Sequence, residues 1–251
     1  MQRYLLNVSY IGTNFRGFQR QLDGSLPRQD DPTTIQGCIE MGLNTLNTKN
    51  MPYIRSSSRT DAGVHALNST CHVDLETYWG TPYEPQNITS ALNRVFCKQN
   101  FPIKVVNTFG VPQTFDCRHD AIARTYLYRF VRIDPHPSAA DPLLQHIPIE
   151  HYDRAWFATC TEFNEDRMKD ATKLFHGFHD FRTFMGRGGQ EKLINKITRR
   201  SITKLSIEKV PLDLCSKFSR PLYGFNGKAE LQSYNIVVEA SGFLYNQVSE
   251  F

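Results

Sequence analysis

The chain has 251 residues, of which 40% are hydrophobic and 22% are charged, and its formal net charge is +4. This length accommodates one large or two ordinary domains, and the apolar fraction is that of a globular protein and not of a disordered chain. No window approaches the roughly 18 to 20 apolar residues of a membrane span, and the opening MQRYLLNVSYIG has too short an apolar core for a secretory signal. We therefore expect a soluble compartment, which could be the cytoplasm, the nucleus or the mitochondrion.

In the first half of the sequence, residues 3–12 alternate enough to predict a strand. The loop that follows, GTNFRGFQRQ, carries Arg16, Arg20 and aromatic residues that we expect to be exposed. Thr34 can cap a helix over residues 35–46. Further along the chain, STCHVDLETY and IKVVNTFGVP predict strands, and QNITSALNRVF predicts a helix.

In the second half, RTYLYRFVR predicts a strand with Tyr126, Tyr128 and Phe130 on one face. EDRMKDATKLFHG predicts an amphipathic helix, residues 211–230 an inserted loop, and ITRRSITKLSIEKV and SYNIVVEASGFLY two more strands. Two successive sets of strands and helices, without a regular βαβα alternation, indicate an α+β fold with antiparallel sheets. We place the boundary near Asn107, which gives domains 1–106 and 107–251 that meet at a cleft.

The six cysteines are scattered along the chain with no Cys-x-x-Cys pair. This spacing argues against a disulfide framework and against a conventional zinc site. We therefore expect reduced thiols that lie mostly in the core.

Positive charge is concentrated between Arg182 and Lys209, where eight basic residues stand against two acidic ones. Such an excess suits a phosphate-facing surface, because Lys and Arg release counterions when they neutralise a polyanion. A solvated charged face is the plainer interpretation and, on charge alone, the better supported one.

The stretch SSSRTDAGVHAL, residues 56–67, combines groups that suit an active site. If it is extended, Arg59 and Asp61 lie on the same side and can pair or share a ligand. A neighbouring guanidinium keeps a carboxylate ionised, which a nucleophile or a base requires. Gly63 allows a tight turn or a close approach, and His65 either orients the loop through a hydrogen bond or only packs.

Taken alone, an Arg-x-Asp pattern also fits a surface turn with a weak salt bridge, and carboxylate chemistry also fits a hydrolase or a metal site. A metal site would need more ligands, and no second acidic cluster lies near this one in the sequence. The residues by themselves therefore predict a preorganised carboxylate and no particular reaction.

The motifs RTDAGVHA, YIGTNFRGFQRQ, TTIQGCIEMGL, FDCRHDAIARTYLYRF, HDFRTFMGRG and SGFLYNQV resemble those of the TruA family of tRNA pseudouridine synthases. They occur in the family's order and span nearly the whole chain, with Phe18 where the family has tryptophan. SSRTDAGVHAL and ARTYLYRF look closest to the family's eukaryotic branch called pseudouridine synthase-like protein 1.

This resemblance implies two ferredoxin-like α/β subdomains whose antiparallel sheets flank a basic catalytic cleft. It implies that Asp61 is the catalytic residue of an isomerase that converts uridine to pseudouridine in tRNA without a cofactor or a metal. It further implies that Tyr126 lies against the target base and that Arg59 takes part in base flipping. The basic residues between Arg182 and Lys209 would then face the tRNA backbone, with Arg16 and Arg20 as a possible extension of that surface.

The resemblance departs from the family at the end of the chain. The family motif matched by GFLYNQV continues with an arginine and a hydrophobic helix, whereas here Ser249 takes the arginine's position and the chain stops at Phe251. We therefore expect a C-terminally truncated second domain. An alternative function follows, a catalytically impaired module that binds tRNA, and the homodimer common in the family would be altered.

Overall fold

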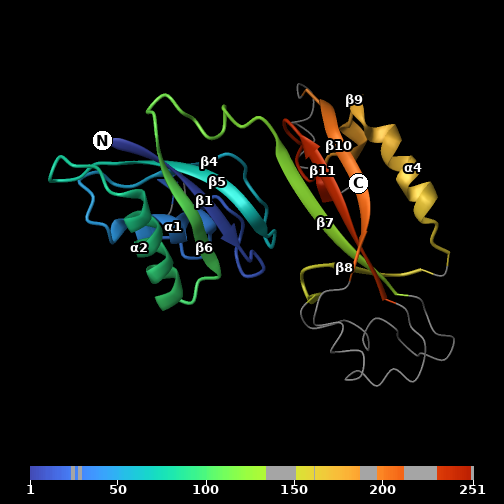
Figure 1. Cartoon of the computed structure of the whole chain (residues 1–251), viewed down its shortest axis with the longest axis horizontal. Helices are drawn as coiled ribbons and strands as arrows, with labels where there is room; N and C mark the ends of the chain where they lie inside the picture. The colour runs from blue at the N-terminus through green and yellow to red at the C-terminus, as the bar shows by residue number, and fades with distance from the viewer. Residues whose placement is uncertain are drawn as a thin grey trace, which may run out of the picture. The chain divides into compact units, whose positions relative to one another are not determined.

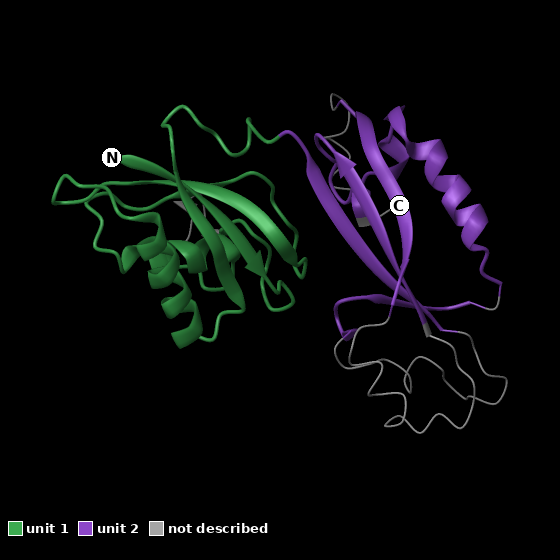
Figure 2. Cartoon of the chain, in the orientation of Figure 1, with its two compact units in different colours: residues 1–121 green, residues 122–251 purple. Residues whose placement is uncertain are grey.

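The computed structural model divides the chain into two compact units, Met1–Ala121 and Ile122–Phe251 (Figure 2). The structure describes residues 1–23, 26–27, 30–133, 151–160, 162–186, 197–211 and 231–249. Apart from its first residue, the loop predicted over residues 211–230 lies outside this part of the chain.

The first unit is built on a four-stranded antiparallel sheet with the order β4-β5-β1-β6 (Figure 1). Its elements are β1 (Gln2–Tyr10), α1 (Ile35–Asn44), β4 (Ile54–Ser56), β5 (Ala66–Leu75), α2 (Pro85–Lys98) and β6 (Ile103–Val111), with a small hairpin of β2 (Leu22–Asp23) and β3 (Leu26–Pro27). The succession β-α-β-β-α-β with this strand order is the ferredoxin-like arrangement expected for this half.

The core of the first unit forms because the sequence alternates along β1. Tyr4, Leu6, Val8 and Tyr10 all point inward and are at most 3% exposed. Helix α2 adds Ile88, Leu92 and Phe96, which recur every four residues and share one face. This packed layer is the support from which the loops at the end of the sheet extend.

Helix α1 begins where the sequence predicts, since the Thr34 side chain accepts a hydrogen bond from Gly37 N at 3.2 Å. It ends at Asn44, two residues before the predicted end. Helix α2 starts with Pro85 in its first turn, a position where proline costs no hydrogen bond.

The second unit contains a five-stranded sheet with the order β8-β7-β11-β10-β9. All neighbours are antiparallel except β7 and β8, which run parallel. Its elements are β7 (Arg124–Ile133), β8 (Trp156–Thr159), α4 (Glu165–Phe175), β9 (Gly177–Asp180), a short 3-10 helix (Arg182–Phe184), β10 (Arg199–Val210), β11 (Leu231–Ala240) and a second 3-10 helix (Gln247–Ser249). The predicted α+β class with antiparallel sheets is thus confirmed, while the short strands β8 and β9 were not predicted.

Aromatic packing dominates the core of the second unit. Phe130 on β7 and Tyr234 on β11 are partners in register, and their rings stack with centroids 4.9 Å apart. Helix α4 packs against β10 and has no fully buried residue of its own. Asn164 caps this helix by accepting a hydrogen bond from Arg167 N at 2.9 Å.

The structural division falls after Ala121, later than the boundary expected near Asn107. Asn107 lies within β6, where it is the register partner of Asn7 on β1. Residue 107 therefore belongs to the first sheet, because cutting there would separate paired strands. That the two units act as the pseudouridine synthase domains remains a prediction.

Three of the cysteines in the described part of the chain, Cys38, Cys71 and Cys117, are buried thiols, whereas Cys97 is exposed and Cys160 is half-buried. Cys215 lies outside the described residues. Among the helices that the structure describes, none is long and apolar enough to cross a membrane.

A bidentate ion pair ties β1 to β5. Arg3 Nε and Nη2 donate to the two carboxylate oxygens of Asp74, each at 2.7 Å. The hydrogen bonds from Arg3 lower the pKa of the Asp74 carboxyl below its usual range. Arg3 Nη1 also donates to Phe115 O at 2.6 Å, so the pair anchors the segment that leaves β6.

At neutral pH we expect Asp74→Asn to lower the free energy of unfolding by about 1 to 3 kcal/mol, the usual cost of losing hydrogen bonds to a charged group. Because the folded-state pKa of Asp74 lies below the unfolded value of about 3.9, this stability is present above that pH and is lost as the pH falls through the folded-state pKa. Native-state hydrogen exchange at β1 amides would measure the difference in the free energy of unfolding between Asp74→Asn and wild type. A difference that stays constant down to about pH 2 would contradict this account.

Candidate active site

Asp61 lies on the loop between β4 and β5, here called the Asp61 loop (residues 57–65). The base of the loop is closed by Ser57 N, which donates to Thr70 O at 2.9 Å. Val64 N donates to Asp61 O at 3.3 Å and makes a turn over Gly63, whose φ is +79°. The Asp61 side chain is exposed, and within the described residues no side chain forms an ion pair with it.

A second segment, the N-terminal loop (residues 12–18), holds the Asp61 loop on both sides of Asp61. Phe18 N donates to Thr60 O at 3.0 Å, and Gly63 N donates to Phe15 O at 3.2 Å. Phe15 and Phe18 are only 6% and 2% exposed, so the expectation that these aromatics are exposed is wrong. Their rings join the hydrophobic core and anchor the N-terminal loop, which in turn fixes the backbone around Asp61.

Two glycines allow the loops to approach this closely. A Cβ atom at Gly12 would lie 1.9 Å from Val64 O, which no side chain can tolerate without a backbone shift. Gly17 has φ +107°, a region that favours glycine, and a Cβ there would lie 3.0 Å from Thr60 O. The contact between the loops is therefore one of backbone against backbone.

His65 orients the loop through a hydrogen bond, which decides between the two roles left open by the sequence. Its Nδ1 atom accepts a hydrogen bond from Gly12 N at 2.9 Å. Accepting at Nδ1 requires the imidazole tautomer that carries its proton on Nε2. The motif's histidine thus fastens the end of the Asp61 loop to the start of the N-terminal loop.

Arg59 is exposed and does not pair with Asp61, contrary to expectation. Its Nη1 atom donates to Gln19 Oε1 at 2.8 Å, so the guanidinium is held by the residue that follows the N-terminal loop. The side chains of Arg59 and Asp61 are thereby presented separately at the same loop. Gln19 was not singled out from the sequence, because nothing in its local pattern indicates a partner 40 residues away.

Arg16 is exposed as expected, but Arg20 is not a free surface charge. Arg20 Nε lies 3.0 Å from Glu40 Oε2 on α1, and the two side chains are only 11% and 7% exposed. Glu40 Oε1 also accepts hydrogen bonds from Gln36 Nε2 at 3.0 Å and from Ile54 N at 2.9 Å. Burial raises the pKa of the Glu40 carboxyl, and these hydrogen bonds and Arg20 oppose that rise. Glu40 thus links the segment that follows the N-terminal loop to β4, the strand that leads into the Asp61 loop.

Tyr126 lies on β7 of the second unit and is half-buried. Its ring packs edge-on against Phe243, with centroids 5.1 Å apart and an interplanar angle of 87°. Both aromatics contact the cluster around Phe181, Ile202 and Val238. Tyr126 therefore belongs partly to the core of its unit and keeps an exposed portion.

The basic stretch between Arg182 and Lys209 is described only in part. Arg182, Arg199, Lys204 and Lys209 are exposed and Arg200 is half-buried, while Arg187, Lys192 and Lys196 lie outside the described residues. Some of the charge is balanced locally, since Arg199 is the register partner of Asp180 and Lys204 that of Glu239.

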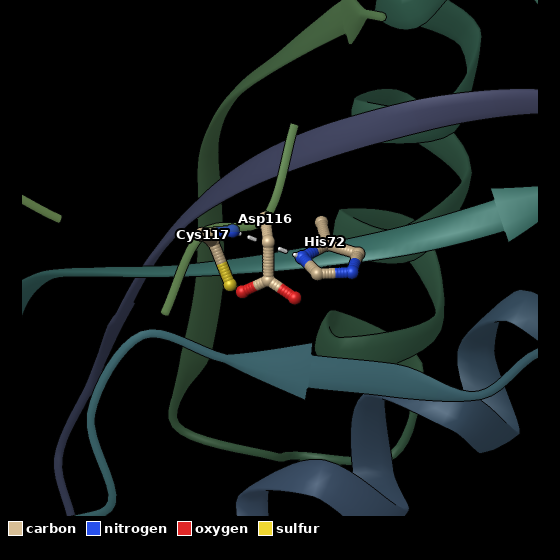
Figure 3. Close-up of side chains that lie close together, drawn as sticks. All are labelled: His72, Asp116 and Cys117. Carbon is tan, nitrogen blue, oxygen red and sulfur yellow. Dashed lines mark hydrogen bonds between the residues drawn. The ribbon is translucent and has the colours of Figure 1, made fainter. Parts of the chain in front are cut away.

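One group in the described part of the chain brings metal-ligand atoms together. His72, Asp116 and Cys117 have such atoms within 4.8 Å of one another (Figure 3). Their atoms already have protein partners: His72 Nδ1 accepts from Cys117 N at 3.2 Å, Cys117 Sγ donates to Arg55 O at 3.1 Å, and Asp116 Oδ1 accepts from Arg118 N at 2.8 Å. Burial lowers the pKa of His72, which favours the neutral ring that these bonds require. We interpret the group as a latch that fastens Asp116 and Cys117 to β4 and β5, because a metal ion would have to displace these hydrogen bonds.

The fold and the site define an α+β protein that presents one carboxylate on a loop preorganised by backbone contacts. The chain is 32% identical over 214 residues to tRNA pseudouridine synthase A of Methylobacterium radiotolerans, a match that covers 85% of this chain and 72% of that protein. It is 29% identical over 247 residues to tRNA pseudouridine synthase-like 1 of Mus musculus, covering 98% of this chain and 76% of that protein. A third relative, tRNA pseudouridine synthase A of Agrobacterium fabrum, is 32% identical over 184 residues, which are 73% of this chain and 60% of that protein.

No family model matches the chain. The chain nevertheless belongs to the tRNA pseudouridine synthase A family, since its identity to the Methylobacterium protein extends over most of both sequences. The resemblance seen in the motifs is confirmed, and the relatives include both bacterial enzymes and the eukaryotic synthase-like 1 proteins.

Proposed function

We propose that this protein isomerises uridine to pseudouridine in tRNA and that Asp61 is its catalytic residue. Membership of the tRNA pseudouridine synthase family supports the reaction and the substrate class. The observation that carries the assignment of Asp61 is its presentation: an exposed carboxylate whose backbone is clamped on both sides by Thr60 O and Gly63 N. Such preorganisation is what a group that must meet a substrate atom at a fixed position requires.

The chemistry is balanced without a co-substrate. The bond from the ribose C1′ to uracil N1 breaks, the uracil turns in the site, and C1′ joins C5 of the same base. The proton on C5 is lost and N1 gains one, so the product is an isomer of the substrate. An ionised carboxylate can assist by attacking the sugar, by attacking the base or by removing a ribose proton, and each route needs the carboxylate accessible to the nucleotide.

Two further residues complete the proposal. Tyr126 would lie against the target uracil with the part of its ring that the core leaves exposed. Arg59 would assist in flipping the nucleotide, and its exposed side chain, held only by Gln19 among the described residues, can exchange that hydrogen bond for one to RNA. The exposed basic residues Arg199, Lys204 and Lys209 on β10 would contact tRNA phosphates.

The experiment incubates the purified chain with a mixed tRNA pool, without added metal or cofactor, and maps pseudouridine nucleotide by nucleotide. We expect conversion at defined uridines in folded tRNA and less in an unstructured RNA of the same composition, because the family acts on tRNA. Salt-sensitive tRNA binding without any conversion would contradict the proposal and support a binding module instead. Light scattering on the same sample tests the homodimer that the resemblance implies.

A further inference from the structure

We propose that Tyr10 is a positioning residue for Asp61, acting through Thr60. The inference rests on the proposed catalytic role of Asp61. It concerns the one side-chain hydrogen bond that the structure gives to the residue directly before Asp61: the Tyr10 hydroxyl and Thr60 Oγ1 share a hydrogen bond of 2.8 Å.

The sheet and the hydrophobic core hold the Tyr10 side chain in a fixed position. It is the last residue of β1, which lies between β5 and β6 in the sheet, and it is in register with Ala66 on one side and Ile103 on the other. Its side chain is 3% exposed, and its ring contacts that of Phe18 with centroids 6.2 Å apart. A side chain fixed in this way loses little further entropy when it holds a partner.

The end of β1 pairs with the start of β5, the strand that leaves the Asp61 loop. Val8 is in register with Ser69 and Tyr10 with Ala66, so β5 has one residue more than β1 between these two pairs and carries a bulge-like irregularity there. Bulges bend the strand that contains the extra residue and occur next to active sites. Tyr10 itself keeps the alternation of β1, which places its side chain on the same buried face as Val8.

Thr60 is held at both of its polar groups. Its side chain meets the Tyr10 hydroxyl, and its carbonyl oxygen accepts the hydrogen bond from Phe18 N. A β-branched side chain with one fixed rotamer restricts its own backbone, and the next backbone unit is that of Asp61. Loss of the hydroxyl would leave the carbonyl contact but free the Thr60 side chain, so that the Asp61 carboxylate would sample more positions.

The test compares Tyr10→Phe with Tyr4→Phe, a matched control on the same strand. Tyr4 is 1% exposed and its hydroxyl donates to Tyr83 O at 2.8 Å, so the control also removes a buried tyrosine hydroxyl, but one without contact to the Asp61 loop. We expect Tyr10→Phe to lower kcat by about 10- to 100-fold, the cost of a small misplacement of a reacting group. KM for tRNA should stay within about threefold, and Tyr4→Phe should leave kcat unchanged.

Variants at Thr60 sharpen the comparison. Thr60→Ser keeps the hydroxyl and should retain most of the activity, whereas Thr60→Val should match Tyr10→Phe. The double variant Tyr10→Phe with Thr60→Val should be no slower than either single variant, because both remove the same bond. Three results would each overturn the inference. The first is a double variant in which the kcat losses of the two single variants multiply. The others are an unchanged kcat in Tyr10→Phe and a loss of kcat in Tyr4→Phe as large as that in Tyr10→Phe.

A second readout is independent of turnover. Amide exchange in the Asp61 loop should be at least about tenfold faster in Tyr10→Phe than in wild type, while amides of β5 stay as protected as before. Unchanged exchange in the loop would overturn the positioning role even if wild type showed no conversion. Asp61→Asn is measured in parallel. If Asp61→Asn keeps full activity, the proposed catalytic role of Asp61 fails and the positioning inference fails with it. If Asp61→Asn is inactive and Tyr10→Phe keeps full activity, the positioning inference alone fails.

Discussion

Replacement of Asp61 by asparagine is expected to lower the rate of uridine conversion by about 10²- to 10⁴-fold. An amide has the size of the carboxylate but cannot act as a nucleophile or as a base, and such groups contribute about 10² to 10⁴ in rate. Because the Asp61 side chain is exposed and has no ion-pair partner among the described residues, the substitution should not change the free energy of unfolding. Pseudouridine formed per enzyme under single-turnover conditions is the measurement.

The matched control is Asp170→Asn, which removes one carboxylate from the exposed pair with Lys173 on α4. This variant carries the same change in charge and should convert uridine as fast as wild type. Binding of tRNA is measured for both, since the loss of a negative charge can itself tighten RNA binding. Equal rates for wild type and Asp61→Asn would remove Asp61 from the mechanism.

The largest expected effect on stability comes from Glu40. Substitution by leucine takes the carboxylate away from the buried guanidinium of Arg20 and removes the acceptor of Ile54 N and Gln36 Nε2. Removing one partner of a buried ion pair costs about 3 to 5 kcal/mol. We expect Glu40→Leu to lower the free energy of unfolding by that amount, as measured by native-state hydrogen exchange at α1 amides. It should also slow uridine conversion, because β4 leads into the Asp61 loop.

Two companion variants separate the causes. Glu40→Gln keeps an acceptor for Ile54 N and removes only the charge, so it should lower the free energy of unfolding by less than Glu40→Leu does. Adding Arg20→Met to Glu40→Leu removes the buried charge altogether and should recover part of the loss, since an apolar pair can replace a buried ion pair. A double variant as unstable as Glu40→Leu would show that the hydrogen bond to Ile54 N, and not the ion pair with Arg20, carries the stability.

The regular elements were largely predictable because they depend on neighbours in the sequence. The alternation of β1, the four-residue spacing in α2 and the cap at Thr34 are local patterns, and the structure has these elements within a few residues of the predicted bounds. The short edge strands β8 and β9 were missed because four residues are too few to establish a period. Their pairing is decided by the neighbouring strands β7 and β10.

In the candidate site, too, local sequence patterns predict some features, whereas contacts between distant segments are not predictable from them. The residues of RTDAGVHA mark the loop, and the glycines at positions 12 and 17 mark a segment of special backbone geometry, but nothing local says that the two segments touch. The expectations that failed did so for this reason. A loop position predicts exposure for Phe15 and Phe18, but both are buried. The sequence pattern around Arg20 predicts a surface charge, because its partner Glu40 lies 20 residues away.

By itself, the sequence determined the α+β class, most helices and strands, the family and the loop that carries Asp61. Only the tertiary structure decided how that loop is held: Thr60 by Tyr10 and Phe18, and His65 by Gly12. The physical reason is the range of the interactions. Periodicity and capping act over a few residues, whereas these hydrogen bonds join segments about 40 to 50 residues apart and form only once the sheet has brought the segments together.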